Sequence, residues 1–322
     1  MHKNRRGSLK VFAVILIGGK GKRLRPITTL ACPKAFLPIT KSDQTMFKKT
    51  LNRILKLMPA QRVMIVANMR HFKLIVKDFP GISDGNLLME PIAKNTAPAI
   101  ALAAMELKRR FGDAVMLVLP ADHYIADDKA YIRSIKSALN FINSHIDKDL
   151  FMVFGIRPTF PATVYGYIKM RQDCGGGSCV QKVDRFVEKP DRRTAEKFLK
   201  DGSYFWNSGM FVFKASTILS ALKMLAPDIY SRAKNIGKVK LDALYKKMPN
   251  ISIDYAVMEK ANPIYCVEGD YGWEDVGSLT SLKEALEREL CSADKPLSRK
   301  TVKPSASSAA KILERLRRKM NT

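Results

Sequence analysis

The hydrophobic residues of the first half of the chain form short continuous runs, separated by segments with helical spacing. Apolar runs rich in β-branched residues at 11–17, 62–68 and 114–123 predict buried strands of a parallel sheet. Residues 95–111 begin with an Asn-Thr capping signal and repeat apolar positions at helical spacing, which predicts a helix. This alternation favours an α/β sheet with helices on both faces.

The second half has a mixed pattern. Runs at 151–156, 182–190 and 205–216 predict strands. Residues 191–202 predict a helix that ends at a glycine, and residues 278–290 predict the helix that closes the folded part.

The residue composition of the sequence changes after Cys291. Ser, Pro and Lys dominate the next stretch, which predicts a disordered linker. The segment KILERLRRKM at 311–320 then places apolar residues on one helical face and basic residues on the other. We therefore divide the chain into a basic N-terminal segment at 1–10, one domain at 11–291, and a basic linker with a short amphipathic helix at 292–322.

Net charge and cysteine content limit the classes of partner and the cellular compartment that the sequence suggests. The chain has 56 Lys and Arg residues against 30 Asp and Glu, a net charge of +26, which favours nucleic acid, anionic membrane or a phosphorylated substrate as partner. No apolar run approaches the roughly 18 residues that span a bilayer, and the run after the N-terminus is short for a signal peptide, so a cytoplasmic protein is expected. Cys174 and Cys179 lack the C-x-x-C spacing of a zinc site, which predicts unligated, reduced thiols.

The glycine-rich loop after the first predicted strand does not fit two common phosphate motifs. In a Walker A alignment, Leu16 stands at the first glycine and Arg23 at the Ser or Thr that binds magnesium. In a dinucleotide fingerprint, Leu24 stands at the third glycine.

What remains is a loop of three glycines followed by two cations. Gly18, Gly19 and Gly21 would let backbone N–H groups face a phosphate chain. Arg23 and Lys34 could neutralise phosphoryl oxygens. The loop alone leaves two interpretations open, a phosphate site or an ordinary turn with solvated cations.

The motif GGKGKRL at 18–24, followed by Pro33-Lys34, resembles the signature of the sugar-phosphate nucleotidyltransferases. Seven further segments occur in the order typical of the mannose-1-phosphate guanylyltransferases, or GDP-mannose pyrophosphorylases: residues 90–104, 119–125, 154–169, 186–191, 204–213, 252–261 and 273–278. The resemblance covers roughly residues 11–290. It departs at Lys20 and Lys22, where small Ser and Thr are usual, and the large C-terminal extension of many relatives is missing.

The resemblance implies a fold and a reaction. The fold is an α/β, Rossmann-like mixed sheet flanked by helices, the nucleotide-diphospho-sugar transferase fold, here with a short basic C-terminal tail. The reaction joins GTP to mannose 1-phosphate and releases pyrophosphate. Because the sugar phosphate is already an anionic nucleophile, the site must supply positioning and cations rather than a general base.

The resemblance also assigns catalytic roles. Asp122 and Asp275 would bind Mg²⁺, which prefers carboxylate and phosphate oxygens. The alternative for each is a helix cap, before the helical segment after Asp122 and before the last helix. Arg23 and Lys34 would contact the phosphates, and His123 receives no catalytic role.

Two groups of residues would then bind the substrates. The nucleotide would be held by the glycine loop and by the segment before the helix at 95–111, whose N-terminus is expected to present free N–H groups: Gly18, Gly19, Gly21, Arg23, Glu90, Asn95, Thr96 and Ala97. The sugar side would be held by Gly166, Glu188 and Asn207, with Lys189 on the sugar's phosphate.

Two other functions stay open at this point. A related enzyme would use another sugar 1-phosphate, such as a manno-heptose, or another nucleoside triphosphate. A polyanion-binding or regulatory protein on the same scaffold would explain the net charge of +26. The tail at 292–322 could pack on protein, including a second copy in a homodimer, or its basic face could contact nucleic acid or an anionic membrane.

Overall fold

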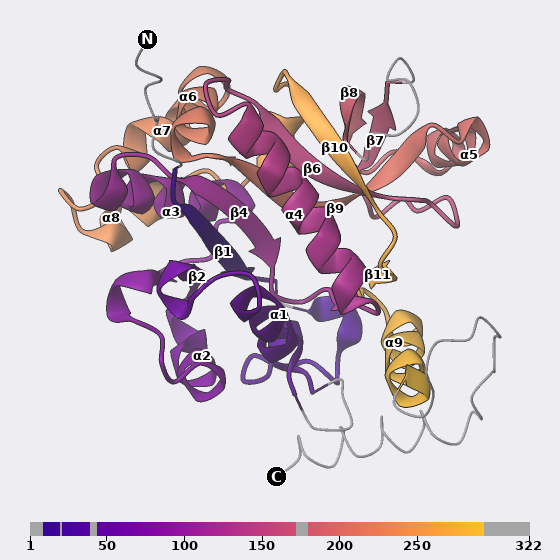
Figure 1. The fold of residues 1–322 in the computed structure, drawn as a ribbon. Helices are drawn as coiled ribbons and strands as arrows, with labels where there is room; N and C mark the ends of the chain where they lie inside the picture. The colour runs from indigo at the N-terminus through magenta and orange to yellow at the C-terminus, as the bar shows by residue number, and fades with distance from the viewer. Residues whose placement is uncertain (1–8, 20, 39–43, 172–179, 293–322) are drawn as a thin grey trace.

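The computed structural model describes residues 9–19, 21–38, 44–171 and 180–292. Their core is a nine-stranded mixed sheet in the order β3-β2-β1-β4-β9-β6-β10-β8-β7, with β7 also pairing with β9 (Figure 1). The strands are β1 (Val11–Ile17), β2 (Val63–Asn68), β3 (Leu87–Glu90), β4 (Val115–Pro120), β6 (Phe151–Ile156), β7 (Tyr167–Met170), β8 (Val180–Val187), β9 (Tyr204–Lys214) and β10 (Ile264–Gly269). A two-stranded ribbon joins β5 (Tyr124–Ile125) to β11 (Trp273–Glu274). The predicted mixed α/β sheet is confirmed.

Nine α-helices are present in the described part of the chain. They are α1 (Met46–Leu55), α2 (Phe72–Asp78), α3 (Thr96–Phe111), α4 (Asp128–Ser144), α5 (Arg192–Asp201), α6 (Ala215–Leu225), α7 (Pro227–Ala233), α8 (Leu241–Lys247) and α9 (Leu279–Ser292). The predicted helices correspond to α3, α5 and α9. As expected, Asn95 caps α3 and Gly202 ends α5, in the left-handed conformation; Asp191 caps the start of α5.

Helices cover both faces of the sheet because its strands alternate between two cores. In β1, Ala13 and Ile15 pack in the core under α1, α2 and α4, while Phe12 and Val14 pack in the core under α3, α6 and α7. Figure 1 shows α4 crossing one face of the sheet. Strands buried on both faces explain why the sequence shows continuous apolar runs rather than alternation.

The parallel strands β3, β2, β1 and β4 end at the same edge of the sheet. β1 and β4 pair in parallel with Leu16 opposite Pro120, and the Ala121 N–H donates to the Leu16 carbonyl at 3.1 Å. The glycine loop and Asp122 therefore leave the sheet side by side. This confirms the expectation that both motifs lie at the carboxyl ends of strands.

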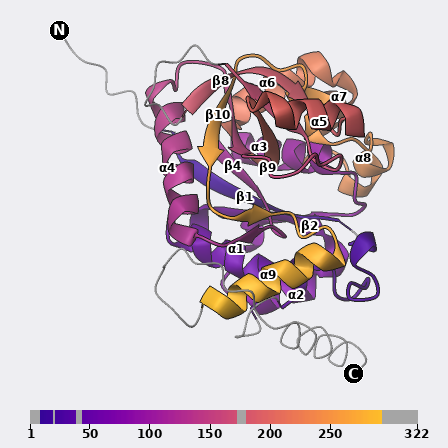
Figure 2. The ribbon, with the colours of Figure 1, turned by 90° about the vertical axis from the view of Figure 1, so that its right-hand side faces the viewer.

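A third, small apolar cluster joins α9 to the loop after β1. Leu24 and Ile27 from that loop pack with Val276, Leu282 and Leu286. α9 lies at one end of the molecule, away from α6 and α7 in both ribbon views (Figure 2). The last described helix is thus attached to the glycine loop.

Several of the sequence-based expectations concern residues outside the described ranges. These are most of the N-terminal segment 1–10, Lys20, the thiols Cys174 and Cys179, and the linker and amphipathic helix at 293–322. Among the helices that are described, none combines the length and the apolar character required to cross a membrane.

Candidate active site

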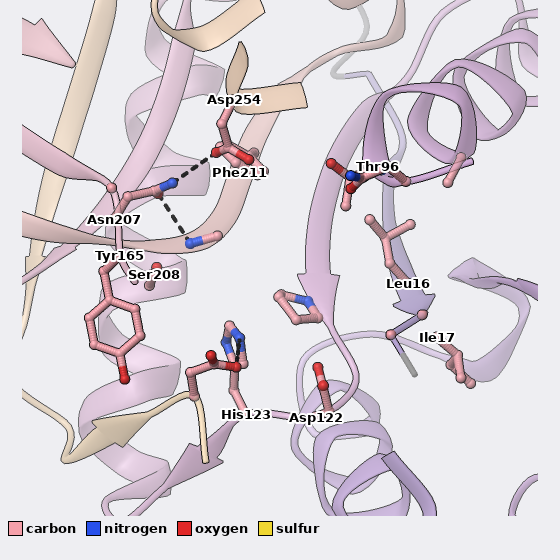
Figure 3. Close-up of a pocket in the computed structure, with 18 of the residues that line it drawn as sticks. Leu16, Ile17, Thr96, Asp122, His123, Tyr165, Asn207, Ser208, Phe211 and Asp254 are labelled. Atoms are coloured by element: carbon pink, nitrogen blue, oxygen red, sulfur yellow. Dashed lines mark hydrogen bonds and ion pairs between the residues drawn. The ribbon is translucent and has the colours of Figure 1, made fainter. Parts of the chain in front are cut away.

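A cavity of about 380 Å³ opens at the carboxyl edge of the parallel strands (Figure 3). One wall comes from β1, β3 and the start of α3, and the opposite wall from β9 and the segments around Gly166 and Asp254. Asp122 and His123 lie at one end (Figure 3), and Asp275 joins them there, with its Oδ1 3.7 Å from His123 Nε2. Its size falls in the range of small-molecule sites, which are roughly 300–1,000 Å³.

The ribbon of β5 and β11 brings Asp122 and Asp275 together. Asp122 lies two residues after the end of β4, and β11 pairs antiparallel with β5, so that Trp273 lies opposite Ile125. Asp275 comes immediately after β11 and therefore returns to the position where Asp122 leaves the sheet. The two carboxylates to which the resemblance assigned a metal therefore lie near each other, at the same lysine.

Lys34 holds these two carboxylates. Its ammonium lies 2.8 Å from Asp275 Oδ1 and 3.2 Å from Asp122 Oδ2, and it also donates to the Asp275 carbonyl. Burial alone would lower the pKa of Lys34, but the two carboxylates outweigh burial and the pKa lies above its ordinary value. Burial is the largest single influence on Asp275 and would raise its pKa, but Lys34, His123 and Arg23 together outweigh burial, and the pKa lies below its ordinary value.

Neither aspartate is a helix cap, the alternative that the sequence left open. Asp127 caps α4 by accepting from the N–H groups of Lys129 and Ala130. At the start of α9, the Ser278 hydroxyl accepts from the Ser281 N–H at 3.0 Å. Both candidate metal ligands are therefore left to face a cation.

The donor set suits magnesium. Two carboxylates already share one cation, the Lys34 ammonium. In the described ranges, no cluster of three or more His, Cys, Asp or Glu side chains could hold a metal without help. Mg²⁺ is usually held by one or two carboxylates together with substrate phosphates and water. The residues present fit a metal that arrives with a phosphorylated substrate.

The glycine loop is split between the cavity and its rim. Gly18 and Gly19 line the cavity, whereas Gly21 accepts a 2.6 Å hydrogen bond from the Thr28 hydroxyl. Arg23 is 61% exposed and lies 3.7 Å from Asp275 Oδ2, in a larger groove beyond Tyr165 and Trp273. Arg23 can therefore reach the end of the cavity that holds Asp275 from outside the cavity.

Glu90 is a buried carboxyl in the wall of the cavity. It ends β3, and Asn68 Nδ2 donates to its carbonyl at 3.1 Å. Among the described residues, its Oε1 has no hydrogen-bond partner. Burial raises the pKa of Glu90 to about 7, with a partial opposing effect from the Tyr245 hydroxyl. Such an unpaired buried acceptor is suited to a ligand that donates hydrogen bonds.

The N-terminus of α3 corrects one expectation. Asn95 and Thr96 line the cavity, but the lining does not include Ala97. The Thr96 N–H donates to the Asn95 side chain, and the Ala97 N–H donates to the Ile251 carbonyl at 3.2 Å. These two N–H groups are therefore not free, because a cap and a neighbouring segment already satisfy them.

The opposite wall contains the predicted sugar-side residues Gly166, Glu188 and Asn207. The Asn207 N–H donates to the Gly166 carbonyl at 2.8 Å. A Cβ on Gly166 would overlap the Glu188 carboxylate, so only glycine leaves that carboxylate in place. Lys189 donates to Glu188 Oε1 and is half exposed.

Backbone strain surrounds the cavity. In the described part of the chain, three non-glycine residues have positive φ: Asn95 at 69°, Lys189 at 46° and Val276 at 49°. Asn95 lines the cavity, Lys189 follows Glu188, and Val276 follows Asp275. Such backbone costs about 1–3 kcal/mol per residue and is concentrated at functional sites.

Sequence reasoning gave no role to three residues of the cavity. His123 accepts a 3.0 Å hydrogen bond from Trp273 Nε1, and its Nε2 lies 3.7 Å from Asp275 Oδ1. Burial lowers the pKa of His123. Tyr165 and Asp254 also line the cavity. The position of His123 next to Asp122 could have indicated that His123 lies in the cavity. The motif at 252–261 could have indicated the same for Asp254.

Comparisons with known proteins agree with this geometry. Residues 12–291 match the Nucleotidyl transferase family. The chain is 40% identical over 290 residues to the xanthan biosynthesis protein XanB of Xanthomonas campestris pv. campestris (strain B100), covering 87% of this chain and 60% of that protein. It is 36% identical to the mannose-1-phosphate guanylyltransferase of Escherichia coli (strain K12), covering 85% of this chain and 59% of that protein. The chain thus spans about 60% of the length of these relatives.

A solved structure shares the fold. A protein of Thermus thermophilus, described as a mannose-1-phosphate geranyltransferase, superimposes with a TM-score of 0.77 at 32% sequence identity. The match covers 86% of this chain and 79% of that one. The family match itself spans residues 12–291 and therefore includes both walls of the cavity.

Proposed function

The chain belongs to the nucleotidyl transferase family, and from that premise we propose that it transfers GMP from GTP to mannose 1-phosphate, giving GDP-mannose and pyrophosphate. The proposal rests on one observation, the arrangement of the cavity. Two carboxylates that share the Lys34 ammonium lie at its end. The buried acceptor Glu90 lies on one wall, and Glu188 and Asn207 lie on the other. Such a cavity suits a base on one side and a polyol on the other. The name of the Escherichia coli relative supports the same substrates.

The proposed step is an in-line displacement at the α-phosphate of GTP. A phosphate oxygen of mannose 1-phosphate forms a new P–O bond, the bond to the β-phosphate oxygen breaks, and pyrophosphate leaves with the electron pair. No proton has to be removed from the nucleophile. The protein's contribution is to align two polyanions and to balance their charge.

Asp122 and Asp275 would hold Mg²⁺ in this reaction, because carboxylates are its preferred protein ligands. When bound, Mg²⁺ supplies Lewis-acid stabilisation of charge on the phosphates. Lys34 and Arg23 would contribute the remaining positive charge, Lys34 from a buried position and Arg23 from the exposed rim. Gly18 and Gly19 line the same cavity as Asp122 and Asp275 and, because they have no side chains, leave room for a phosphate chain.

Glu90 supports guanine as the base. Guanine presents two adjacent donors, N1–H and the N2 amino group, to the two oxygens of one carboxylate. Adenine, cytosine and uracil each present a donor beside an acceptor, so a carboxylate would meet one repulsive lone pair. A site built around a buried acceptor discriminates strongly against a ligand that leaves it unpaired.

On the other wall, Gly166, Glu188 and Asn207 are proposed to face the sugar, and Lys189 its phosphate. The carboxylate and amide groups here suit hydroxyl ligands, since they can accept and donate hydrogen bonds. Lys189 is half exposed beside Glu188, so its ammonium can turn toward a phosphate.

The direct test is turnover with GTP, mannose 1-phosphate and Mg²⁺, followed by pyrophosphate release. We expect kcat/KM for GTP to exceed that for ATP, UTP and dTTP, and mannose 1-phosphate to exceed glucose 1-phosphate. Equal use of dTTP would assign the chain to a different nucleotide. Absence of pyrophosphate release with every pair would contradict the proposed function.

A further inference from the structure

The motif SIDYAVMEKA at 252–261 is not used by the proposed reaction, yet it contacts both walls of the cavity. Its middle forms a short π-helix, Asp254–Met258. The Ile253 N–H donates to the Thr96 hydroxyl at 2.8 Å, which ties the motif to the start of α3. π-helices are rare and occur frequently at functional sites.

Asp254 brings a carboxylate into the sugar-side wall. It lines the cavity together with Glu188 and Asn207, and Figure 3 shows Asp254 next to Asn207. Asn207 Nδ2 donates to Asp254 Oδ1 at 2.9 Å, while Asn207 Oδ1 accepts from the Gly209 N–H at 3.1 Å. The second bond fixes the orientation of the Asn207 amide, so its amino group has to point at Asp254.

The other end of the motif supports Glu188. Glu259 Oε1 accepts from the Glu188 N–H at 3.0 Å. Gly166 leaves the space that the Glu188 carboxylate occupies. One continuous motif therefore contributes one carboxylate to this wall and holds the backbone of a second.

The carboxylates of Asp254 and Glu188, which lie on the same wall of the cavity, require hydrogen-bond donors. Burial and, next, the charge of Glu188 raise the pKa of Asp254 to about 6, with smaller opposing effects from Lys189 and Asn207. Sugar hydroxyls are neutral donors that form strong, charge-assisted hydrogen bonds with carboxylates. A ring with neighbouring hydroxyls would therefore satisfy a wall that the protein alone leaves rich in acceptors.

We propose that Asp254 binds a hydroxyl of the sugar and determines which sugar 1-phosphate is accepted, and that Glu259 is a positioning residue for Glu188. This inference rests on the proposed function for the identity of the second substrate. It assigns a role to the motif that neither the reaction nor the metal site requires. A merely structural Asp254 would instead serve only to orient Asn207.

The test compares Asp254→Asn with Asp242→Asn, an exposed aspartate on α8 outside the cavity lining. Both full-length variants are assayed with mannose 1-phosphate and its 2-, 3-, 4- and 6-deoxy analogues. We expect Asp254→Asn to lower kcat/KM for mannose 1-phosphate roughly 10- to 100-fold, because a hydrogen bond to a charged group is lost. The Kd for GTP should change less than twofold, and Asp242→Asn should behave as the wild type.

The deoxy series separates sugar binding from a structural role. In the wild type, one deoxy analogue should lose far more activity than the others. In Asp254→Asn, the fold-loss of kcat/KM caused by removing that one hydroxyl should be at least fivefold smaller, since the partner of the hydroxyl is gone. An unchanged penalty for every analogue would overturn the assignment, even if overall activity falls.

Glu259 is tested by a pair of variants. Glu259→Ala should raise KM for the sugar phosphate with little change in kcat, and Glu259→Gln should restore it, because an amide oxygen can still accept from the Glu188 N–H. Equal KM values in the alanine variant and the wild type would overturn the positioning role.

Direct binding keeps this inference separate from the proposed reaction. Saturation-transfer NMR with mannose 1-phosphate in the absence of GTP reports on the sugar side alone. Loss of the signal in Asp254→Asn, with the signal kept in Asp242→Asn, supports the inference even if no pyrophosphate is released. Equal signals in the two variants, or no signal with the wild type, would overturn it.

Discussion

The ammonium of Lys34 binds Asp275 twice, through the carboxylate Oδ1 at 2.8 Å and through the backbone carbonyl of the same residue. These residues are 241 positions apart in the sequence. Because Lys34 also lies 3.2 Å from Asp122 Oδ2, one buried cation links the loop after β1, the end of β4 and the end of β11. A charge in this position supports both the architecture and the proposed chemistry.

Removing this cation should destabilise the protein in a way that magnesium reverses. Lys34→Met leaves two carboxylates facing each other, and loss of one partner of a buried ion pair costs about 3–5 kcal/mol. We expect a lower melting temperature, with a larger upward shift on adding MgCl₂ than in the wild type. Thermal denaturation with and without MgCl₂ measures both effects.

Lys49→Met is the matched control for that experiment. Lys49 forms an ion pair with Glu289, and both side chains are 17% exposed. Its loss takes a cation from one carboxylate rather than from a converging pair, so magnesium should not restore stability. Identical magnesium shifts in both variants would argue against a cation site between Asp122 and Asp275.

The two aspartates should be needed for turnover, and each single variant should still fold, because Lys34 keeps the other carboxylate as its partner. Asp122→Asn or Asp275→Asn removes a ligand for the metal, and losing one charge-stabilising group typically costs on the order of a hundredfold in rate. The assay is pyrophosphate release over a range of magnesium concentrations, with circular dichroism to check the fold. Near-normal rates in both variants would rule out this metal assignment.

Glu90 should make the protein less stable as the pH rises. Its pKa rises from the ordinary 4.5 to about 7 in the folded state, so between these values the folded state binds more protons than the unfolded state. The unfolding free energy should therefore fall by up to about 3 kcal/mol from pH 4.5 to pH 7, at about 1.36 kcal/mol per pKa unit.

Urea denaturation of the wild type and Glu90→Gln at pH 5 and pH 8 measures this contribution. The glutamine variant lacks the titrating group, so its advantage over the wild type should be larger at pH 8. Parallel behaviour of the two proteins would show that Glu90 does not carry a raised pKa.

A methyl group on Gly166 should affect the sugar side alone. The new Cβ would overlap the Glu188 carboxylate, which is the end of a flexible side chain and can move aside without unfolding the protein. We expect Gly166→Ala to raise KM for the sugar phosphate about tenfold, the cost of one hydrogen bond, with the Kd for GTP unchanged. In Gly81→Ala the added Cβ meets nothing within 4 Å, so kinetics of the wild type are expected there. A selective loss of GTP affinity in Gly166→Ala would contradict the assignment of this wall.

The sequence predicted the parts of the fold that have strong local signals. β1 begins and ends as expected because seven apolar residues are followed directly by glycine. α5 was predicted with its stop at Gly202, and the structure adds that Asp191 caps its start. α6 was not predicted, because it follows β9 without a loop and the apolar pattern continues across Lys214.

The site was predictable where a motif resembled a known family, and less so where tertiary contacts decide. Asp122 and Asp275 converge only through the pairing of β5 with β11, which no local pattern of the sequence predicts. Asp254 meets Asn207 across 47 positions. The free N–H groups expected at α3 were wrong at Ala97, because Ile251 from a distant segment accepts that hydrogen bond.

The small apolar cluster that contains Val276 affects how the protein should lose activity at high temperature. It is the smallest of the three buried clusters, and it fastens both the turn that carries Arg23 and the strand end that carries Asp275. Regions with few buried contacts open at lower free energy than the body of a sheet. Detachment of α9 would free both charges while the nine strands of the sheet stay paired, so we expect the proposed activity to be lost on heating before the sheet unfolds.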